Sequence, residues 1–156
     1  PKHDDHELFE LLILESFQAG LSWITILKKR ENFRKAFDNF DIQKVANYNN
    51  KKIAELLSNS GIIRSKNKIL SAINNAKIFM QIQKDFGSFA NYIWSFTDNK
   101  VLKNTTGKII TSSSLSDEIS KDLKKRGMKY VGTVIIYSYL QAIGIIDDHD
   151  QNCFKY

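Results

Sequence analysis

Residues 7–23 of the 156-residue chain read ELFELLILESFQAGLSW and contain its strongest helical signal. Four of these residues recur at i, i+3, i+4 and i+7, on one face of a helix expected from Glu7 to Ala19: Leu8, Leu11, Leu12 and Glu15. Gly20 should end this helix and Ser22 should cap the next, because glycine suits a helix C-terminus and serine an N-terminus. The sequence therefore predicts two helices that meet at a short corner.

The helical spacing continues beyond this corner, and capping residues divide it into further segments. Helices are expected at about 23–37, 41–46, 51–57, 65–86, 88–96, 114–126 and 131–143. The polar stretch from Thr97 to Ser113 is expected to be a surface loop, in which Ile109 and Ile110 give the only hint of a strand. Only one proline is present to interrupt a helix. An all-α fold of seven or eight helices is predicted, with no clear sheet, in one domain spanning residues 1–156.

The composition excludes several classes of protein. An apolar share of 42% is too high for a disordered chain, and the single cysteine cannot form an intrachain disulfide. The most apolar stretch, Val131 to Ile146, is shorter than the ~20 residues that span a bilayer, so it is interpreted as a core helix and no membrane partner is expected. With 23 Lys and Arg against 17 Asp and Glu, the net charge of +6 favours a polyanionic partner.

Glu15 is a charged residue on an otherwise apolar helix face, because the other residues of that face are leucines. A carboxylate on that face would be buried, and its pKa would shift unless it were paired. One interpretation is a frayed helix end at which Glu15 reaches solvent or an arginine. The other is a recessed carboxylate that accepts hydrogen bonds from a ligand.

The corner at residues 18–23 also allows two interpretations. It is either a simple junction between two helices with a hydrophobic staple, or a protruding loop that presents Leu21 as a wedge. In the second case Trp23 lies beside Glu15 and offers a stacking surface. A carboxylate and an indole at one corner suit a flat heteroaromatic ligand with exocyclic hydrogen-bond donors.

Two basic segments are candidates for contacts with DNA phosphates. Residues 56–65 read LLSNSGIIRS, a helix, a turn at Gly61 and a helix start, which is the geometry of a helix–hairpin–helix motif or of an ordinary turn between helices. Arg64, with Lys66 and Lys68 after it, adds positive charge there. Lys124, Lys125 and Arg126 either bind phosphates or simply complement the dipole at a helix C-terminus.

His149 and Cys153 stand at i and i+4 near the end of the chain. That spacing suits two ligands of a zinc ion, whereas a structural zinc site needs four. His3 and His6 lie at the other end of the chain. The pair alone is therefore compatible either with a zinc site or with no function.

The sequence resembles the DNA-3-methyladenine glycosylase I family along essentially its whole length. The likeness lies in LFELLILE at 8–15, QAGLSWITILKKRENF at 18–33, GIIR at 61–64, IWSF at 93–96, KKRG at 124–127 and KYVGT at 129–133, and it continues to His149 and Cys153. It implies an all-helical helix–hairpin–helix fold. It also implies a bacterial, cytoplasmic enzyme of base-excision repair that cuts the N-glycosidic bond of 3-methyladenine in alkylated double-stranded DNA and releases 3-methyladenine.

The resemblance also implies roles for individual residues. Glu15 would recognise the flipped base as the catalytic carboxylate, Trp23 would stack on it, and Ser138 would be a polar residue of the pocket. The corner containing Gln18, Gly20 and Leu21 would fill the gap left by the extruded nucleotide. His149 and Cys153 would form the second half of the family's zinc site, whose other ligands, with aromatic residues of the pocket, precede the position matching Pro1. We therefore expect an N-terminally incomplete chain without a fully coordinated zinc ion.

Other functions fit the same residues. The rival hypothesis is a non-enzymatic helix–hairpin–helix DNA-binding module or an inactive fragment of the glycosylase, since the basic charge fits both equally. A zinc-dependent interaction domain is a third reading. A monomer is expected in each case.

Overall fold

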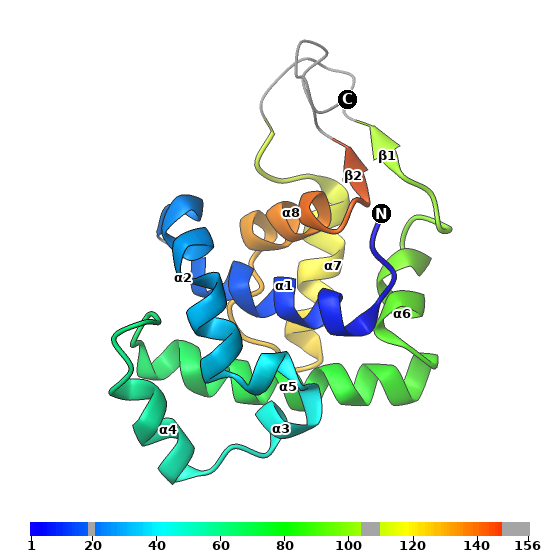
Figure 1. Cartoon of the computed structure of the whole chain (residues 1–156). Coiled ribbons are helices and arrows are strands. Elements are labelled where there is room, and N and C mark those ends of the chain that lie inside the picture. The colour runs from blue at the N-terminus through cyan, green and yellow to red at the C-terminus, as the bar shows by residue number, and fades with distance from the viewer. Residues whose placement is uncertain (19–20, 104–109, 148–156) are drawn as a thin grey trace.

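The computed structural model describes residues 1–18, 21–103 and 110–147. Within these ranges the chain forms eight α-helices, one short 3-10 helix and two short strands (Figure 1). In chain order they are α1 (Asp5–Gln18), α2 (Trp23–Ala36), η1 (Asp38–Phe40), α3 (Ile42–Ala46), α4 (Asn50–Leu57), α5 (Lys66–Phe86), α6 (Phe89–Ser95), β1 (Leu102–Lys103), α7 (Ser114–Lys125), α8 (Thr133–Ala142) and β2 (Ile146–Asp147). The predicted all-α fold is confirmed.

Side-chain caps set the starts of most helices. Ser22 caps α2 as predicted, and at the starts of three further helices the cap likewise accepts a hydrogen bond from the backbone N–H three residues on: Asp41, Ser65 and Ser88. Helix α7 begins with a capping box, in which Ser113 and Ser116 satisfy each other's backbone N–H groups. Polar residues at helix starts were thus a reliable guide to element boundaries.

The structure differs from the prediction at two places near the C-terminal end. The last helix begins at Thr133 rather than Val131, because Tyr130 adopts a φ of +55° and Gly132 then forms the N-terminal cap. No sheet was expected, yet β1 and β2 pair in parallel, with Leu102 opposite Ile146. Residues 102–103 lie in the predicted loop. Ile110 belongs to no strand, and Ile109 lies outside the described residues.

Helix α1 is the centre of the molecule, with α2, α5, α6 and α8 packed around it (Figure 1). Ten consecutive residues, from Leu8 to Phe17, are buried, so α1 has no solvent face over most of its length. The sequence pattern had indicated a single apolar face. A helix that is buried on all sides carries any charged residue into the core, and α1 carries two: Glu10 and Glu15.

Asp5 in the first turn of α1 fixes the start of α6. Its Oδ2 accepts hydrogen bonds from the Phe89 N–H at 2.9 Å and from the Gln83 amide at 2.8 Å. Its Oδ1 accepts one from the Ala90 N–H at 2.9 Å. A carboxylate at a helix N-terminus thus satisfies two backbone donors that have no partner inside the helix.

Replacing Asp5 by Ala should lower the free energy of unfolding by about 2–3 kcal/mol, because two N–H groups of α6 lose a charged acceptor. Urea denaturation measures this difference. Glu7→Ala is the matched control on the same helix. Among the described residues Glu7 pairs with Lys2 alone, and both side chains are largely solvent-accessible, so its loss should change stability by less than about 1 kcal/mol. Equal effects of the two substitutions would contradict the assignment of Asp5 as the clamp.

Candidate functional site

Glu15 is a buried carboxylate with one oxygen left unpartnered by the described residues. It lies in the last turns of α1, its residue is 3% exposed, and its Oε2 has no hydrogen-bond partner within the described part of the chain. Burial alone raises the pKa of this carboxyl from 4.5 to about 7. The expectation of a recessed carboxylate is confirmed. The frayed-end alternative is wrong, because Glu15 is buried away from solvent and Arg30 and Arg34 bind Glu10 instead. Such a group marks a candidate ligand site.

Helix α8 packs against α1, the helix that carries Glu15. The buried Tyr139 hydroxyl donates to the Leu8 carbonyl at 2.8 Å and so joins α8 to α1. Burial raises the pKa of Tyr139, and the negative charges of Asp5 and Glu15 raise it further. Ser138, expected in the pocket, is half-buried on the same helix.

The corner between α1 and α2 is held by hydrogen bonds around its described residues. The Gln18 side-chain amide donates to the Leu21 carbonyl at 2.7 Å, and the Leu21 N–H donates to the Gln18 carbonyl at 2.7 Å. Leu21 is 38% exposed although it is apolar, so its expected exposure is confirmed. Gly20 lies outside the described residues. Trp23 is half-buried and packs against the core at the start of α2.

A junction that the sequence did not reveal supports the end of α1. The Lys68 ammonium, in the first turn of α5, donates to the Phe17 carbonyl at 2.9 Å and lies 6.0 Å from the centre of the Tyr130 ring. Burial lowers the pKa of Lys68. Ser16 donates to the Tyr130 carbonyl at 3.3 Å. The partners lie far apart in the chain, so no local pattern could identify the junction.

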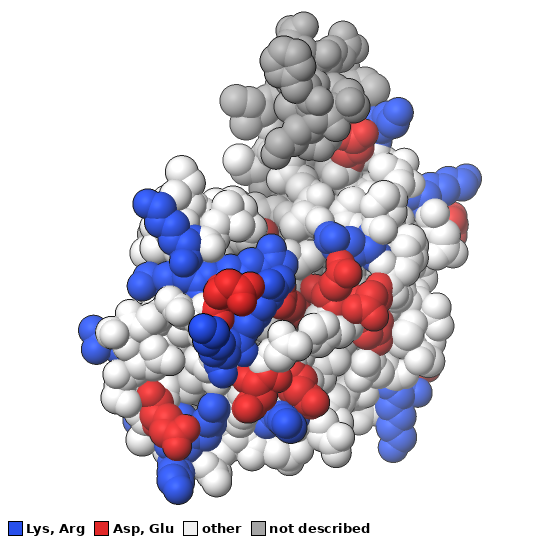
Figure 2. All heavy atoms as spheres, in the orientation of Figure 1, with Lys and Arg blue, Asp and Glu red and all other residues white. Residues whose placement is uncertain are grey.

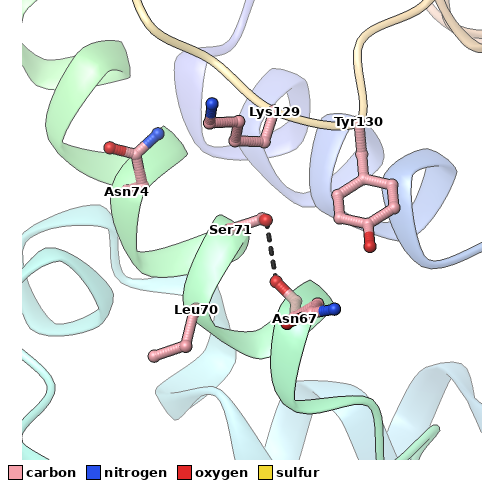
Figure 3. A pocket seen from close by; sticks show the side chains of 6 residues that line it. All are labelled: Asn67, Leu70, Ser71, Asn74, Lys129 and Tyr130. Carbon is pink, nitrogen blue, oxygen red and sulfur yellow. Dashed lines mark hydrogen bonds between the residues drawn. The ribbon is translucent and has the colours of Figure 1, made fainter.

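A cavity of about 510 Å³ lies beside this junction, and Figure 3 shows the side chains that line it. It lies between α5 and the segment before α8, and its lining residues are Asn67, Leu70, Ser71, Asn74, Lys129 and Tyr130. Asn75 holds that segment in place, since its amide donates to the Lys129 carbonyl at 2.8 Å and accepts from the Lys129 N–H at 2.9 Å. Amide, hydroxyl and ammonium groups contribute to the lining of this cavity, but most of its accessible wall is apolar.

The turn at Gly61 joins α4 to α5, as the sequence predicted. A Cβ at Gly61 would lie 3.1 Å from the Asn32 side chain of α2, so glycine permits a close approach of this turn to α2. The Gly61 N–H donates to the Asn59 side chain at 2.8 Å, and Arg64 is exposed. A second glycine-containing turn, with Gly127 at a φ of +105°, joins α7 to α8. Phosphate binding at Gly61 and Arg64 stays a prediction.

The basic run at the end of α7 divides into two kinds of residue. Lys124 and Lys125 are exposed. Arg126 donates to Asp122 at 2.8 Å, and its guanidinium lies 5.2 Å from the ring centres of both Phe86 and Tyr92. A phosphate contact by Arg126 would compete with these partners. In the face shown in Figure 2, basic and acidic side chains are interspersed rather than gathered in a patch of one sign.

Neither a metal-ligating cluster nor a membrane-spanning helix is found among the described residues. Over residues 1–18, 21–103 and 110–147, no group of three or more His, Cys, Asp and Glu side chains is arranged to hold a metal ion. His149 and Cys153 lie outside these ranges, so their role as zinc ligands stays a prediction. Among the described helices, none is long and apolar enough to cross a membrane.

Comparison with solved structures defines the class to which this fold belongs. A crystal structure described as 3-methyladenine DNA glycosylase I matches with a TM-score of 0.93 and 45% identity, covering 99% of this chain and 86% of that one. A second structure, which concerns 3-methyladenine recognition by the Staphylococcus aureus enzyme, matches with a TM-score of 0.94 and 36% identity, covering 99% and 84%. The fold is therefore that of a helical DNA glycosylase.

Sequence comparison then gives the family. Residues 1–156 match the profile of the methyladenine glycosylase family, and the chain belongs to this family. DNA-3-methyladenine glycosylase 1 of Escherichia coli (strain K12) is 46% identical over 159 residues, which cover 100% of this chain and 85% of that protein. The DNA-3-methyladenine glycosylase of Haemophilus influenzae is 40% identical over 156 residues, covering 98% and 84%.

Proposed function

We propose that this protein is a DNA glycosylase of base-excision repair, which hydrolyses the N-glycosidic bond of 3-methyladenine in alkylated double-stranded DNA. The observation that carries the proposal is Glu15, a buried carboxylate whose Oε2 has no partner among the described residues. The names of the relatives support it, as does a structural neighbour, 36% identical, that was solved in complex with 3-methyladenine. We further propose that it acts as a monomer in the bacterial cytoplasm.

The charge of the damaged base explains why a lone carboxylate suits the site. Methylation at N3 makes adenine in DNA cationic, so a buried carboxylate gains an opposite charge when the base enters. The Glu15 oxygens then accept hydrogen bonds from the adenine edge, while Trp23 stacks on its face and Ser138 contributes a polar contact. Flipping is less costly for a damaged base than for a well-paired one. The site thereby selects the lesion by charge and shape.

The reaction needs no proton for the leaving group. The bond between C1′ and N9 breaks, and its electron pair moves to N9 and cancels the positive charge of the ring. A water oxygen then bonds to C1′ and its proton passes to solvent, leaving an abasic site and neutral 3-methyladenine. Glu15 favours entry of the cationic base over undamaged, neutral bases, which cannot replace the lost hydration of its charge, and its negative charge also complements the positive charge that develops on the sugar as the bond breaks.

We propose that the remaining basic and corner residues hold the duplex. Leu21 and its neighbours Gln18 and Gly20 would fill the gap left by the flipped nucleotide. Phosphates would be bound by groups at two turns: Gly61, Arg64, Lys124, Lys125 and Arg126. Of the four ligands that a structural zinc ion needs, His149 and Cys153 would supply two, so zinc coordination by these residues alone would be incomplete.

The test of the function is the formation of abasic sites. Duplex DNA treated with a methylating agent is incubated with the purified protein, and alkaline cleavage then reports each abasic site as a strand break. The proposal predicts breaks that increase with time in methylated duplex and not in untreated duplex. Binding of both duplexes without strand breaks would show a DNA-binding module without glycosylase activity.

Leu21→Ala should slow base release about tenfold with little effect on stability, because an exposed leucine contributes little to the core while a wedge acts on the flipped state. Single-turnover base release measures the rate, and urea denaturation measures stability. Ile24→Ala is the matched control, since Ile24 is 64% exposed and lies one turn away on α2. Equal rates for the two variants would remove Leu21 as the wedge.

A further inference from the structure

Glu10 is the second buried carboxylate of α1, and in contrast to Glu15 it is fully paired. It is 4% exposed. Arg30 donates to Oε2 from Nε at 3.0 Å and from Nη2 at 2.5 Å. Arg34 donates to Oε1 from Nε at 2.9 Å and to Oε2 from Nη2 at 3.0 Å. Two guanidinium groups of α2 thus bind one carboxylate of α1 through paired, directional hydrogen bonds.

These contacts outweigh the cost of burial. Burial alone would raise the pKa of Glu10, yet the hydrogen bonds and charges of Arg34 and Arg30 hold it below its ordinary value. Arg34 also donates to Glu31 at 2.6 Å, which fixes its guanidinium from the other side. Figure 2 shows basic and acidic side chains meeting over α1 and α2. The pair of arginines is therefore a rigid link between the two helices.

Helix α2 is attached to the core unevenly. Its buried residues are Ile26, Phe33 and Ala36, and Phe33 packs edge-on against Phe17 of α1 with ring centres 5.0 Å apart. In its first turns Ile24 is 64% exposed and Leu27 is 47% exposed. The half of α2 before Arg30 has one buried residue, Ile26, whereas the half after it has two, Phe33 and Ala36. The half that begins with Trp23 therefore has less support from the core.

This uneven attachment makes the placement of Trp23 sensitive to the ionic link. Arg30 lies seven residues after Trp23, which is about 10 Å along a helix. A tilt of about 5° at Arg30 would therefore move Trp23 by about 1 Å. Apolar contacts alone leave such tilts open because they are not directional, whereas a paired guanidinium and carboxylate fix an orientation.

We propose that Glu10, through Arg30 and Arg34, is a positioning residue that sets the placement of Trp23 relative to Glu15. The inference rests on the proposed function for its kinetic readout and deepens it by naming what orients the stacking wall. Glu10 itself lies outside the base site. A purely structural role for Glu10 would lower stability and leave the base-release rate of the folded protein unchanged.

The test uses Glu10→Gln and the double substitution Arg30→Ala with Arg34→Ala, at a temperature where circular dichroism shows each variant to be folded. Single-turnover base release should fall by about 10- to 100-fold, the effect of a misplacement of about 1 Å. Duplex affinity should be unchanged for Glu10→Gln, which keeps both arginines. Arg30→Ala alone should lower the rate less than the double substitution does, because Arg34 still pairs with Glu10. Ile82→Ala on α5 is the control for lost stability.

A second readout does not depend on activity. The indole N–H signal of Trp23 in nuclear magnetic resonance spectra, distinguished from that of Trp94 by Trp94→Phe, should shift in the Glu10 and double variants and stay in place in Ile82→Ala. An unmoved indole signal with an unchanged base-release rate would overturn the proposal, and so would a loss of rate explained by lost duplex affinity. A wild-type protein without base release would refute the proposed function, and the indole signal would still decide the positioning role.

Discussion

Glu15→Gln is expected to reduce the single-turnover rate of 3-methyladenine release by at least about 100-fold, the scale for losing one preorganised electrostatic group. The substitution keeps the shape of the side chain and removes its charge. A neutral amide cannot complement the cationic base, and its NH₂ group presents donors where the adenine edge also donates. The measurement is base release from methylated duplex with protein in excess over DNA.

Duplex affinity should remain within about twofold of wild type in Glu15→Gln, because phosphate contacts supply most of the binding energy for DNA. Glu7→Gln provides the control, since Glu7 is an exposed glutamate of the same helix whose side chain, within the described part of the chain, pairs with Lys2. Its rate should match wild type. A wild-type rate for Glu15→Gln, or a loss of duplex affinity equal to the loss of rate, would contradict the role assigned to Glu15.

The stability of the protein should depend on pH through the same residue. Burial raises the pKa of Glu15 from 4.5 to about 7, so between these values the folded state keeps a proton that the unfolded chain has lost. The folded state then binds more protons, and the free energy of unfolding falls as the pH rises. The contribution of Glu15 is fully present below about pH 4.5 and is lost through pH 7, a change of about 3 kcal/mol.

Urea denaturation of wild type and Glu15→Gln over this range isolates the effect, since other titrating groups are common to both proteins. The free energy of unfolding of Glu15→Gln minus that of wild type should increase as the pH rises. Between pH 4.5 and a pH above 7 this difference should grow by about 3 kcal/mol. A difference between the two proteins that does not change with pH would show that the Glu15 carboxyl titrates normally. The gain would also show that the site trades stability for recognition.

The ends of the helices could be predicted because they depend on neighbours in the sequence. Ser22 and Ser65 cap helices through the residues that directly follow them. The start of α8 was missed because the left-handed backbone at Tyr130 depends on contacts with other parts of the fold. The pairing of Leu102 with Ile146 was missed for the same reason, since its partners are distant in sequence.

The two buried glutamates show how much of the site could be predicted from the sequence. Glu15 stood out because it shares a helical face with leucines. Glu10 gave no such signal, and its arginine partners lie 20 and 24 residues away. The difference between a paired and an unpaired carboxylate, which separates a positioning group from a ligand-binding group, exists only in three dimensions. Arg126 is the opposite case. The basic residues beside it in the sequence indicated a phosphate contact, whereas the structure shows its guanidinium bound to Asp122.

The most direct test of the central claim identifies the base that leaves the DNA. Methylated duplex DNA is incubated with the wild-type protein, the soluble fraction is separated by liquid chromatography, and each free base is measured against authentic 3-methyladenine and 7-methylguanine. The account predicts that 3-methyladenine appears in proportion to protein and time, and that Glu15→Gln releases almost none. Release of a different base, or tight binding of the duplex with no free base, would contradict it.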